Sequence, residues 1–263
     1  MSLNLSLHAK RALVTGGSQG LGLASALELA DLGAEVLLVA RDKAKLDKAL
    51  STLSAAHGVH HSAYVLDLSD RQAVAQFAST IAAGSPISIL VNNSGGPPPG
   101  PAVAAKPDDY ISAIEGHLAA YQLLVQAVVP GMRAAGYGRI INILSTSVIQ
   151  PLRGLGVSNS LRAAVANWGR TLAAELGGDG ITVNNVLPGM TRTERLDRLF
   201  QFRAQAVGQK VEEAEGLALQ YIPAGRFGKP EEVAAAVAFL ASPAAAYING
   251  VSLAVDGGRL ACQ

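Results

Sequence analysis

The sequence predicts a single doubly wound α/β domain. Short apolar stretches alternate with segments of helical periodicity along most of the chain. Strands that are apolar throughout and separated by helices are typical of a parallel sheet covered on both faces. No linker rich in proline, serine or charge divides the 263 residues and no fixed repeat occurs. We therefore expect one domain over residues 1–263.

The first half of the chain repeats a strand-helix unit. The apolar run 12–15 ends in a glycine turn at 16–22, after which apolar residues recur at helical spacing up to Gly33. The run 36–40 predicts a second strand, and leucines at 46, 50 and 53 predict a helix over 42–56. The unit then returns as a strand at 62–66, a helix at 69–83 with Ser69 as its expected cap, and a strand at 87–91.

The second half continues this alternation. Helical periodicity covers 107–135 and 157–177, and apolar runs predict strands at 139–144 and 181–187. A polar segment over 193–221 breaks the rhythm before a helix at 230–241 that begins with Pro-Glu-Glu. A last strand at 251–255 brings the expected number of strands to seven.

Composition excludes several classes of protein. Lys and Arg number 21 against 20 Asp and Glu, which argues against a basic nucleic-acid-binding face. The one cysteine, Cys262, can form neither an intrachain disulfide nor a cysteine metal site. No secretory leader and no run of 18 apolar residues is present, so we expect a cytoplasmic protein without a membrane partner.

The glycine turn predicts a dinucleotide site. Gly16, Gly20 and Gly22 lie where a strand leads into a helix. Residues without Cβ allow backbone N–H groups to approach a pyrophosphate at the positive end of a helix. A glycine triplet alone is equally compatible with a tight turn, but its place after the first strand of a βαβ unit favours the nucleotide.

Six further segments follow the glycine turn. They lie after the third to sixth expected strands and near the chain end: Asp67, Asn92-Asn93-Ser94-Gly95, Ser145, Asn184-x-x-x-Pro188-Gly189, Gly225–Val233 and Gly250–Gly258. In this order, and with the spacing Thr15-Gly-x-x-x-Gly-x-Gly22, the chain resembles the short-chain dehydrogenase/reductases, and among them the 3-oxoacyl-carrier-protein reductases. The resemblance covers nearly the whole chain. It implies a Rossmann-type sheet in the order 3-2-1-4-5-6-7, a substrate lid over about 193–222 and a homotetramer.

The resemblance also implies a set of cofactor contacts. Asp67 would hold the adenine amino group, Asn92 and Gly95 would line the adenine ribose, and residues 188–193 would hold the nicotinamide amide. The expected cofactor-binding residues are Thr15, Gly16, Ser18, Gln19, Gly20, Leu21, Gly22, Arg41, Asp67, Leu68, Asn92, Ser94, Gly95, Arg162, Pro188, Gly189, Thr191 and Thr193. Two alternatives stay open: Asp67 could cap the following helix, and the Asn92–Asn93 pair could clamp the strand end.

The end of the second strand favours NADP(H) over NAD(H). An acidic residue there would bind the ribose 2′-hydroxyl of NAD and repel a 2′-phosphate. This chain has Ala40 followed by Arg41, and a guanidinium suits a phosphate. The alternative is that Arg41 is an ordinary solvated charge.

The resemblance fails at most of the catalytic positions. It implies a serine, a tyrosine four residues before a lysine, and an asparagine on the preceding helix. Ser145 matches the serine, but the other three positions hold Ser158, Arg162 and His117. We do not expect Ser158 to replace the phenol directly, because a hydroxymethyl group is shorter and a much weaker acid. Arg162 stays protonated, so cofactor binding is its expected role.

His117 is then the candidate proton donor. Its side chain has a pKa near neutrality, which suits a general acid acting directly or through water held by Ser145 and Ser158. The alternative is a buried histidine satisfied by neighbouring backbone groups. For His57, His60 and His61 we expect a surface position and no metal site, because no carboxylate or cysteine accompanies them at a familiar spacing.

Two functional classes follow from these residues. The first is an NADP(H)-dependent oxidoreductase that acts on a small carbonyl or alcohol substrate with an altered proton donor. The second is a catalytically impaired NADP(H)-binding protein that acts through association. The arginines of the lid, Arg195, Arg198 and Arg203, could meet an anionic substrate or simply face water, and water is the simpler expectation.

Overall fold

The protein folds into one parallel sheet with helices on both sides, as the computed structural model shows for residues 3–53 and 58–261. Within these ranges seven strands are ordered β3-β2-β1-β4-β5-β6-β7, and every neighbouring pair is parallel, which confirms the expected fold. The strands are β1 (Arg11–Thr15), β2 (Glu35–Ala40), β3 (Ser62–Val65), β4 (Ile89–Asn92), β5 (Gly138–Ile143), β6 (Ile181–Pro188) and β7 (Ser252–Val255).

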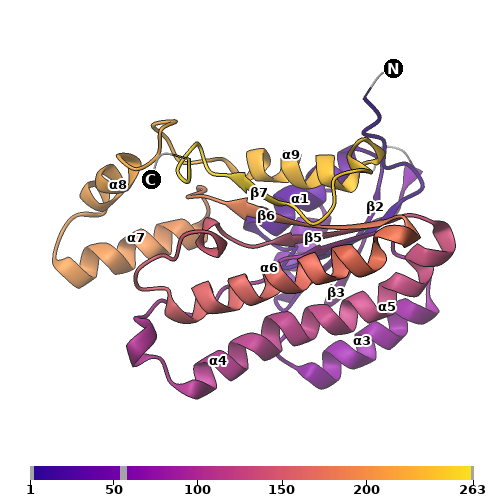
Figure 1. The fold of residues 1–263 in the computed structure, drawn as a ribbon, viewed down its shortest axis with the longest axis horizontal. Coiled ribbons are helices and arrows are strands. Elements are labelled where there is room, and N and C mark those ends of the chain that lie inside the picture. The colour runs from indigo at the N-terminus through magenta and orange to yellow at the C-terminus, as the bar shows by residue number, and fades with distance from the viewer. Residues whose placement is uncertain (1–2, 54–57, 262–263) are drawn as a thin grey trace.

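Two helical layers cover the sheet. The helices of the described ranges are α1 (Gly20–Asp31), α2 (Lys43–Leu50), α3 (Arg71–Ala83), α4 (Pro107–Ile114), α5 (Ala120–Ala135), α6 (Gly156–Leu176), α7 (Glu194–Val207), α8 (Val211–Leu219) and α9 (Pro230–Ala241). One buried cluster packs α1, α2 and α9 on the sheet, and another packs α3, α5 and α6. Figure 1 shows α1 and α9 on one side of the sheet and α3, α5 and α6 on the other. The helices of these layers carry no span long and apolar enough to cross a membrane in the described ranges.

Some element ends differ from the expectation. Helix α3 begins at Arg71, because Asp70 accepts a hydrogen bond from the backbone N–H of Ala73 at 3.0 Å and is therefore the cap in place of Ser69. Helix α2 ends at Leu50, and the end of the helix expected over 42–56 lies partly outside the described residues. Cys262 and His57 lie outside them as well.

The helix expected over 107–135 is interrupted. Helices α4 and α5 are separated by one π-helical turn, Glu115–Ala119, which contains His117. Such a turn widens the helix locally and is frequent at functional sites.

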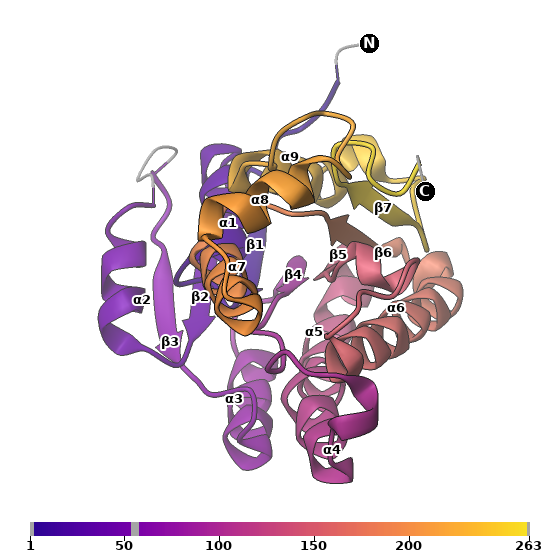
Figure 2. The same ribbon diagram turned by 90° about the vertical axis from the view of Figure 1, so that its left-hand side faces the viewer.

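The polar segment expected over 193–221 folds into α7 and α8. Their inner faces form a small apolar core of their own, in which the ring of Phe200 lies 5.4 Å from that of Phe227. The two helices stand together at one end of the molecule and come to the front when it is viewed from that end (Figure 2). The segment therefore forms a packed helical unit and not an irregular loop.

Candidate active site

The ends of β1 and β4 are joined by hydrogen bonds. The hydroxyl of Thr15 donates to the carbonyl oxygen of Asn93 at 2.8 Å and accepts from its N–H at 2.9 Å. The amide of Asn93 donates to the carbonyl oxygen of Gly16 at 3.2 Å. Asn93 thus clamps the end of β4 to the end of β1, as the alternative for the Asn92–Asn93 pair supposed, and it also holds Gly16, the first residue of the glycine turn.

The glycine turn is packed too closely for side chains at Gly16 and Gly22. Gly16 has a φ of +57°, in the left-handed region that favours glycine. A Cβ on Gly22 would lie 2.2 Å from the carbonyl oxygen of Gly16 and 2.6 Å from the amide nitrogen of Asn93. The first turn of α1 has no side-chain cap and no acidic residue, so its N–H groups remain for an anionic ligand. These features fit the pyrophosphate of a dinucleotide.

Asn92 is buried and Asp67 is exposed, and hydrogen bonds within the protein hold both side chains. The buried amide of Asn92 donates to Asn142 at 2.9 Å, and Asn142 donates in turn to Asn185 at 2.9 Å, so an amide chain crosses β4, β5 and β6. Asp67 accepts from the N–H and the hydroxyl of Ser69 at 2.9 and 2.7 Å. These bonds, with the charge of Arg41 as the weakest contributor, lower the pKa of Asp67.

The loop after β6 meets the glycine turn. A Cβ on Gly20 would lie 3.8 Å from the methyl group of Thr193, whose hydroxyl caps α7. Gln19, at the start of α1, accepts a hydrogen bond from Lys45 of α2 at 2.8 Å. The expected cofactor residues around β1 and β6 therefore lie on neighbouring walls, whereas Leu21 and Leu68 pack against the apolar core.

Ser158 and Arg162 lie together at the end of β5. The Nε of Arg162 donates to the hydroxyl of Ser158 at 3.2 Å, and its Nη1 donates to the carbonyl oxygen of Leu144 at 2.5 Å. Burial and then the charge of Arg195 lower the pKa of Arg162 to about 10. Ser145, next to Leu144, accepts from the N–H of Ser147 at 3.1 Å and keeps its own proton available.

His117 is held between two backbone carbonyl oxygens. Its Nδ1 lies 2.9 Å from the oxygen of Ala113, and its Nε2 lies 2.9 Å from the oxygen of Gly95. Burial, followed by the charge of Arg162, lowers the pKa of His117 to about 4. A neutral imidazole has one N–H, so it can donate to only one of these oxygens. The arrangement matches the alternative of a histidine held by its backbone neighbours.

This low pKa predicts a loss of stability in weak acid that depends on His117. The unfolded state takes up the proton below about pH 6.5, whereas the folded state takes it up only near pH 4, so stability falls as the pH drops through this window. At pH 5 the expected cost is about 2 kcal/mol. Urea unfolding at pH 7 and pH 5 should show this difference between the wild type and His117→Asn. Equal pH dependence in both proteins would contradict the burial of a neutral ring.

One aromatic residue of the site was missed from the sequence. Tyr121 lies one helical turn beyond His117, with the two rings 6.2 Å apart, and its hydroxyl donates to Ser94 at 2.8 Å. Burial raises the pKa of Tyr121 to about 12. The spacing of four residues from His117 was the available signal, because both side chains then share one helix face.

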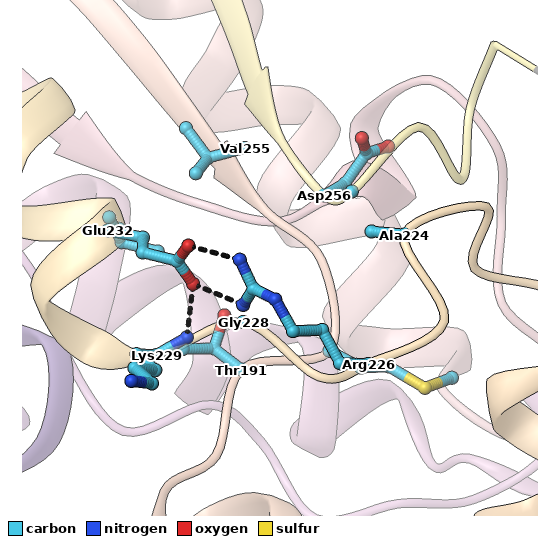
Figure 3. A pocket seen from close by; sticks show the side chains of 11 residues that line it. Thr191, Ala224, Arg226, Gly228, Lys229, Glu232, Val255 and Asp256 are labelled. Carbon is cyan, nitrogen blue, oxygen red and sulfur yellow. Dashed lines mark hydrogen bonds and ion pairs between the residues drawn. The ribbon is translucent and has the colours of Figure 1, made fainter.

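A pocket that includes Thr191, Arg226, Glu232 and Asp256 contains a salt bridge (Figure 3). Arg226 donates to both carboxylate oxygens of Glu232 at 2.6 and 2.8 Å, and the N–H of Lys229 donates to the same carboxylate at 2.7 Å. The bond from Arg226 is the largest cause that lowers the pKa of Glu232 to about 2. These hydrogen bonds join the loop between α8 and α9 to the first turn of α9.

His60 and His61 stand just before β3. His60 is exposed, and the Nδ1 of His61 accepts a hydrogen bond from the N–H of Val36 at 3.1 Å, so His61 supports β2 and is not a free surface residue. Among the described residues no cluster of three His, Cys, Asp or Glu side chains could hold a metal ion.

Strand order and loop geometry define a dinucleotide-binding α/β protein. The family model described as enoyl-(acyl carrier protein) reductase matches residues 16–259. The chain belongs to the short-chain dehydrogenase/reductase family, a family of NAD(P)-dependent oxidoreductases.

Several proteins are similar over their whole length. The 3-oxoacyl-[acyl-carrier-protein] reductase of Pseudomonas aeruginosa is 38% identical, with 97% of this chain and 98% of that protein covered. Gluconate 5-dehydrogenase of Gluconobacter oxydans is 35% identical, with 96% and 95% covered. The crystal structure of L-sorbose reductase from Gluconobacter frateurii, complexed with NADPH and L-sorbose, has a TM-score of 0.91 at 31% identity, with 99% and 100% covered.

Proposed function

We propose that this chain is an NADP(H)-dependent oxidoreductase acting on a small carbonyl or alcohol substrate. The observation that carries the proposal is the glycine turn after β1, where Gly22 packs too closely on Gly16 and Asn93 for a Cβ, followed by an uncapped first turn of α1 whose N–H groups can face a pyrophosphate. A bound nicotinamide supplies or accepts the hydride. Ser145 would orient the reacting oxygen, and Arg162 would contact the nicotinamide ribose.

In this proposal the proton donor is altered, because Ser158 and Arg162 stand at the positions of the family's tyrosine and lysine. A proton from water in the site would reach the substrate oxygen through the hydroxyls of Ser145 and Ser158, each of which passes one proton on and takes one up. His117 can take part only when its Nε2 has left the carbonyl oxygen of Gly95, to which it is 2.9 Å away. That departure would free one ring nitrogen to act as donor or acceptor toward the pocket.

Arg41 would select NADP(H). It follows β2 as an exposed side chain near Asp67, and similar proteins such as L-sorbose reductase have been crystallised with NADPH. A charge-assisted hydrogen bond to the 2′-phosphate should be worth roughly tenfold in affinity. We expect Arg41→Ala to weaken NADPH binding by about this factor and to leave NADH binding unchanged. Titration calorimetry showing equal losses for both cofactors would contradict the role of Arg41.

A second function is favoured by the state of His117. A ring with a pKa of about 4, clamped by two carbonyls, is a poor acid at neutral pH, and Tyr121 points to Ser94. The chain would then bind NADP(H) without turnover and act through association. Steady consumption of NADPH with 3-oxoacyl thioesters, oxidised sugars and simple ketones supports the first function. Tight NADPH binding without any consumption supports the second.

Association into a homotetramer is part of both proposals. Apolar side chains at the β7 edge are exposed, among them Tyr247, Val251 and Leu253. Such a patch on one edge strand is a usual site of contact between subunits. A sedimentation experiment that yields only the monomer mass would refute the association.

A further inference from the structure

One arginine of the lid differs from its neighbours. Arg192 pairs with Glu215 at 2.6 Å, and Arg198 pairs with Glu194 on the same helix. Arg195 lies between them in sequence, and within residues 3–53 and 58–261 it has no hydrogen-bond or ion-pair partner. Arg195 is exposed, as expected for an arginine of this segment, but unlike Arg192 and Arg198 it has no acidic partner there. The side chain of Arg203 lies outside the described residues.

The Arg195 guanidinium lies across the cleft on the loop after β4. A Cβ on Gly96 would be 2.2 Å from its Nη2 and 2.4 Å from its Nη1, so the guanidinium occupies the space that a side chain at position 96 would take. The side chain of Arg195 is exposed to solvent on its other side, and partial burial lowers its pKa. The guanidinium thus lies beside Gly96, next to the Gly95 carbonyl oxygen that contacts His117.

Arg162 presents a second positive charge to the same space. Its Nε and Nη1 are bonded to Ser158 and Leu144, whereas Nη2 has no partner among the described residues. The charge of Arg195 acts on both Arg162 and His117, and no described carboxylate opposes it. Two guanidinium groups repel each other, and Arg162 is partly buried as well, so an anion bound between them would relieve an unfavourable arrangement.

We infer that Arg195 and Arg162 form an anion subsite beside the reacting centre, and that the substrate carries a carboxylate near its carbonyl or hydroxyl group. The inference rests on the proposed function, because it assigns the open side of the cleft to a substrate. A planar guanidinium matches a carboxylate through paired hydrogen bonds. A phosphate of the cofactor has the same chemistry and is the other source of charge that could reach Arg195.

Calorimetry with the NADP⁺-saturated protein tests the subsite. The probes are pyruvate, acetoacetate and levulinate, each compared with its methyl ester, which removes the charge and keeps the ketone. We expect at least one acid to bind the wild type ten times or more tightly than its ester. If none of the three acids binds more tightly than its methyl ester, the inference is overturned.

Variants separate the two sources of negative charge. Arg195→Gln should weaken binding of the acid by about tenfold or more, leave the ester and NADP⁺ affinities unchanged, and be partly rescued by Arg195→Lys. Gly96→Ala should act in the same direction, because its Cβ displaces the flexible end of Arg195 and Gly96 has no left-handed backbone conformation. Arg198→Gln is the matched control, from the same helix, and should change neither affinity. A parallel loss of NADP⁺ affinity in Arg195→Gln would assign Arg195 to a cofactor phosphate and overturn the inference.

The outcomes also separate this inference from the proposed function. One outcome is that the protein does not bind NADP⁺ but does bind the acids, and binds them more weakly after Arg195→Gln. That outcome would support the anion subsite and refute the proposed NADP(H)-dependent activity. NADP⁺ binding with no preference for acids would refute the subsite alone.

Discussion

Replacing Gly22 with alanine should abolish NADPH binding and destabilise the protein by about 3 kcal/mol. The new Cβ would lie 2.2 Å from the carbonyl oxygen of Gly16 and 2.6 Å from the Asn93 amide. The first of these atoms is backbone in the turn, and Asn93 is the clamp between β1 and β4, so neither can move without moving the turn itself. We expect a loss of NADPH affinity of at least 100-fold in calorimetry.

Gly216→Ala provides the matched control. It lies inside α8, and a Cβ at this position meets no atom within 4 Å. Alanine should stabilise this helix by about 0.5–1 kcal/mol and leave NADPH affinity unchanged. If Gly22→Ala binds NADPH as tightly as the wild type, the glycine turn is not the pyrophosphate site.

The double variant Ser158→Tyr with Arg162→Lys should raise the rate of hydride transfer by roughly 10²-fold or more. A phenol at position 158 supplies an acid with an unperturbed pKa of ~10, which the serine lacks. The change to lysine removes the bulk of the guanidinium that now bonds to Ser158 and Leu144, and so makes room for the ring. The measurement is the single-turnover oxidation of NADPH with a ketone in excess.

Two comparisons make this result interpretable. Ser158→Ala should stay as slow as the wild type or become slower, because it adds no acid and removes a hydroxyl. NADPH affinity should be retained in the double variant, which shows that the cleft has kept its shape. A folded double variant that binds NADPH and transfers hydride no faster than the wild type would contradict the idea that the acid limits the reaction.

The fold could be predicted because it follows from local patterns. The apolar strands, the glycine turn after β1 and the family motifs fix the element types, and the strand order then matches the structure. The interruption at 115–119 was missed, since one extra residue in a helical turn hardly disturbs the apolar periodicity around it. The lid helices were missed because their apolar residues, such as Phe200, face each other and not the main core.

The candidate site could be predicted only in part. The glycine turn is local, so its residues and their role in the turn were accessible from spacing. The surroundings of His117 were not, because the oxygen that meets its Nε2 belongs to Gly95, 22 positions earlier in the chain. The contact of Arg195 with Gly96 joins segments even farther apart, and a sequence does not report which arginines lack a carboxylate partner. Charge pairing of this kind is settled by tertiary packing.

Transfer of deuterium tests the central claim most directly. NADPH labelled at the transferable position of C4 is mixed with excess wild-type protein and with the ketone panel, and the products are analysed by mass spectrometry after one turnover. An NADP(H)-dependent oxidoreductase with an altered acid should deliver one deuterium to the carbon of the new alcohol, slowly but stoichiometrically with NADPH. Tight binding of NADPH with no deuterium in any product would contradict the proposed oxidoreductase activity and would support a protein that binds NADP(H) without turnover.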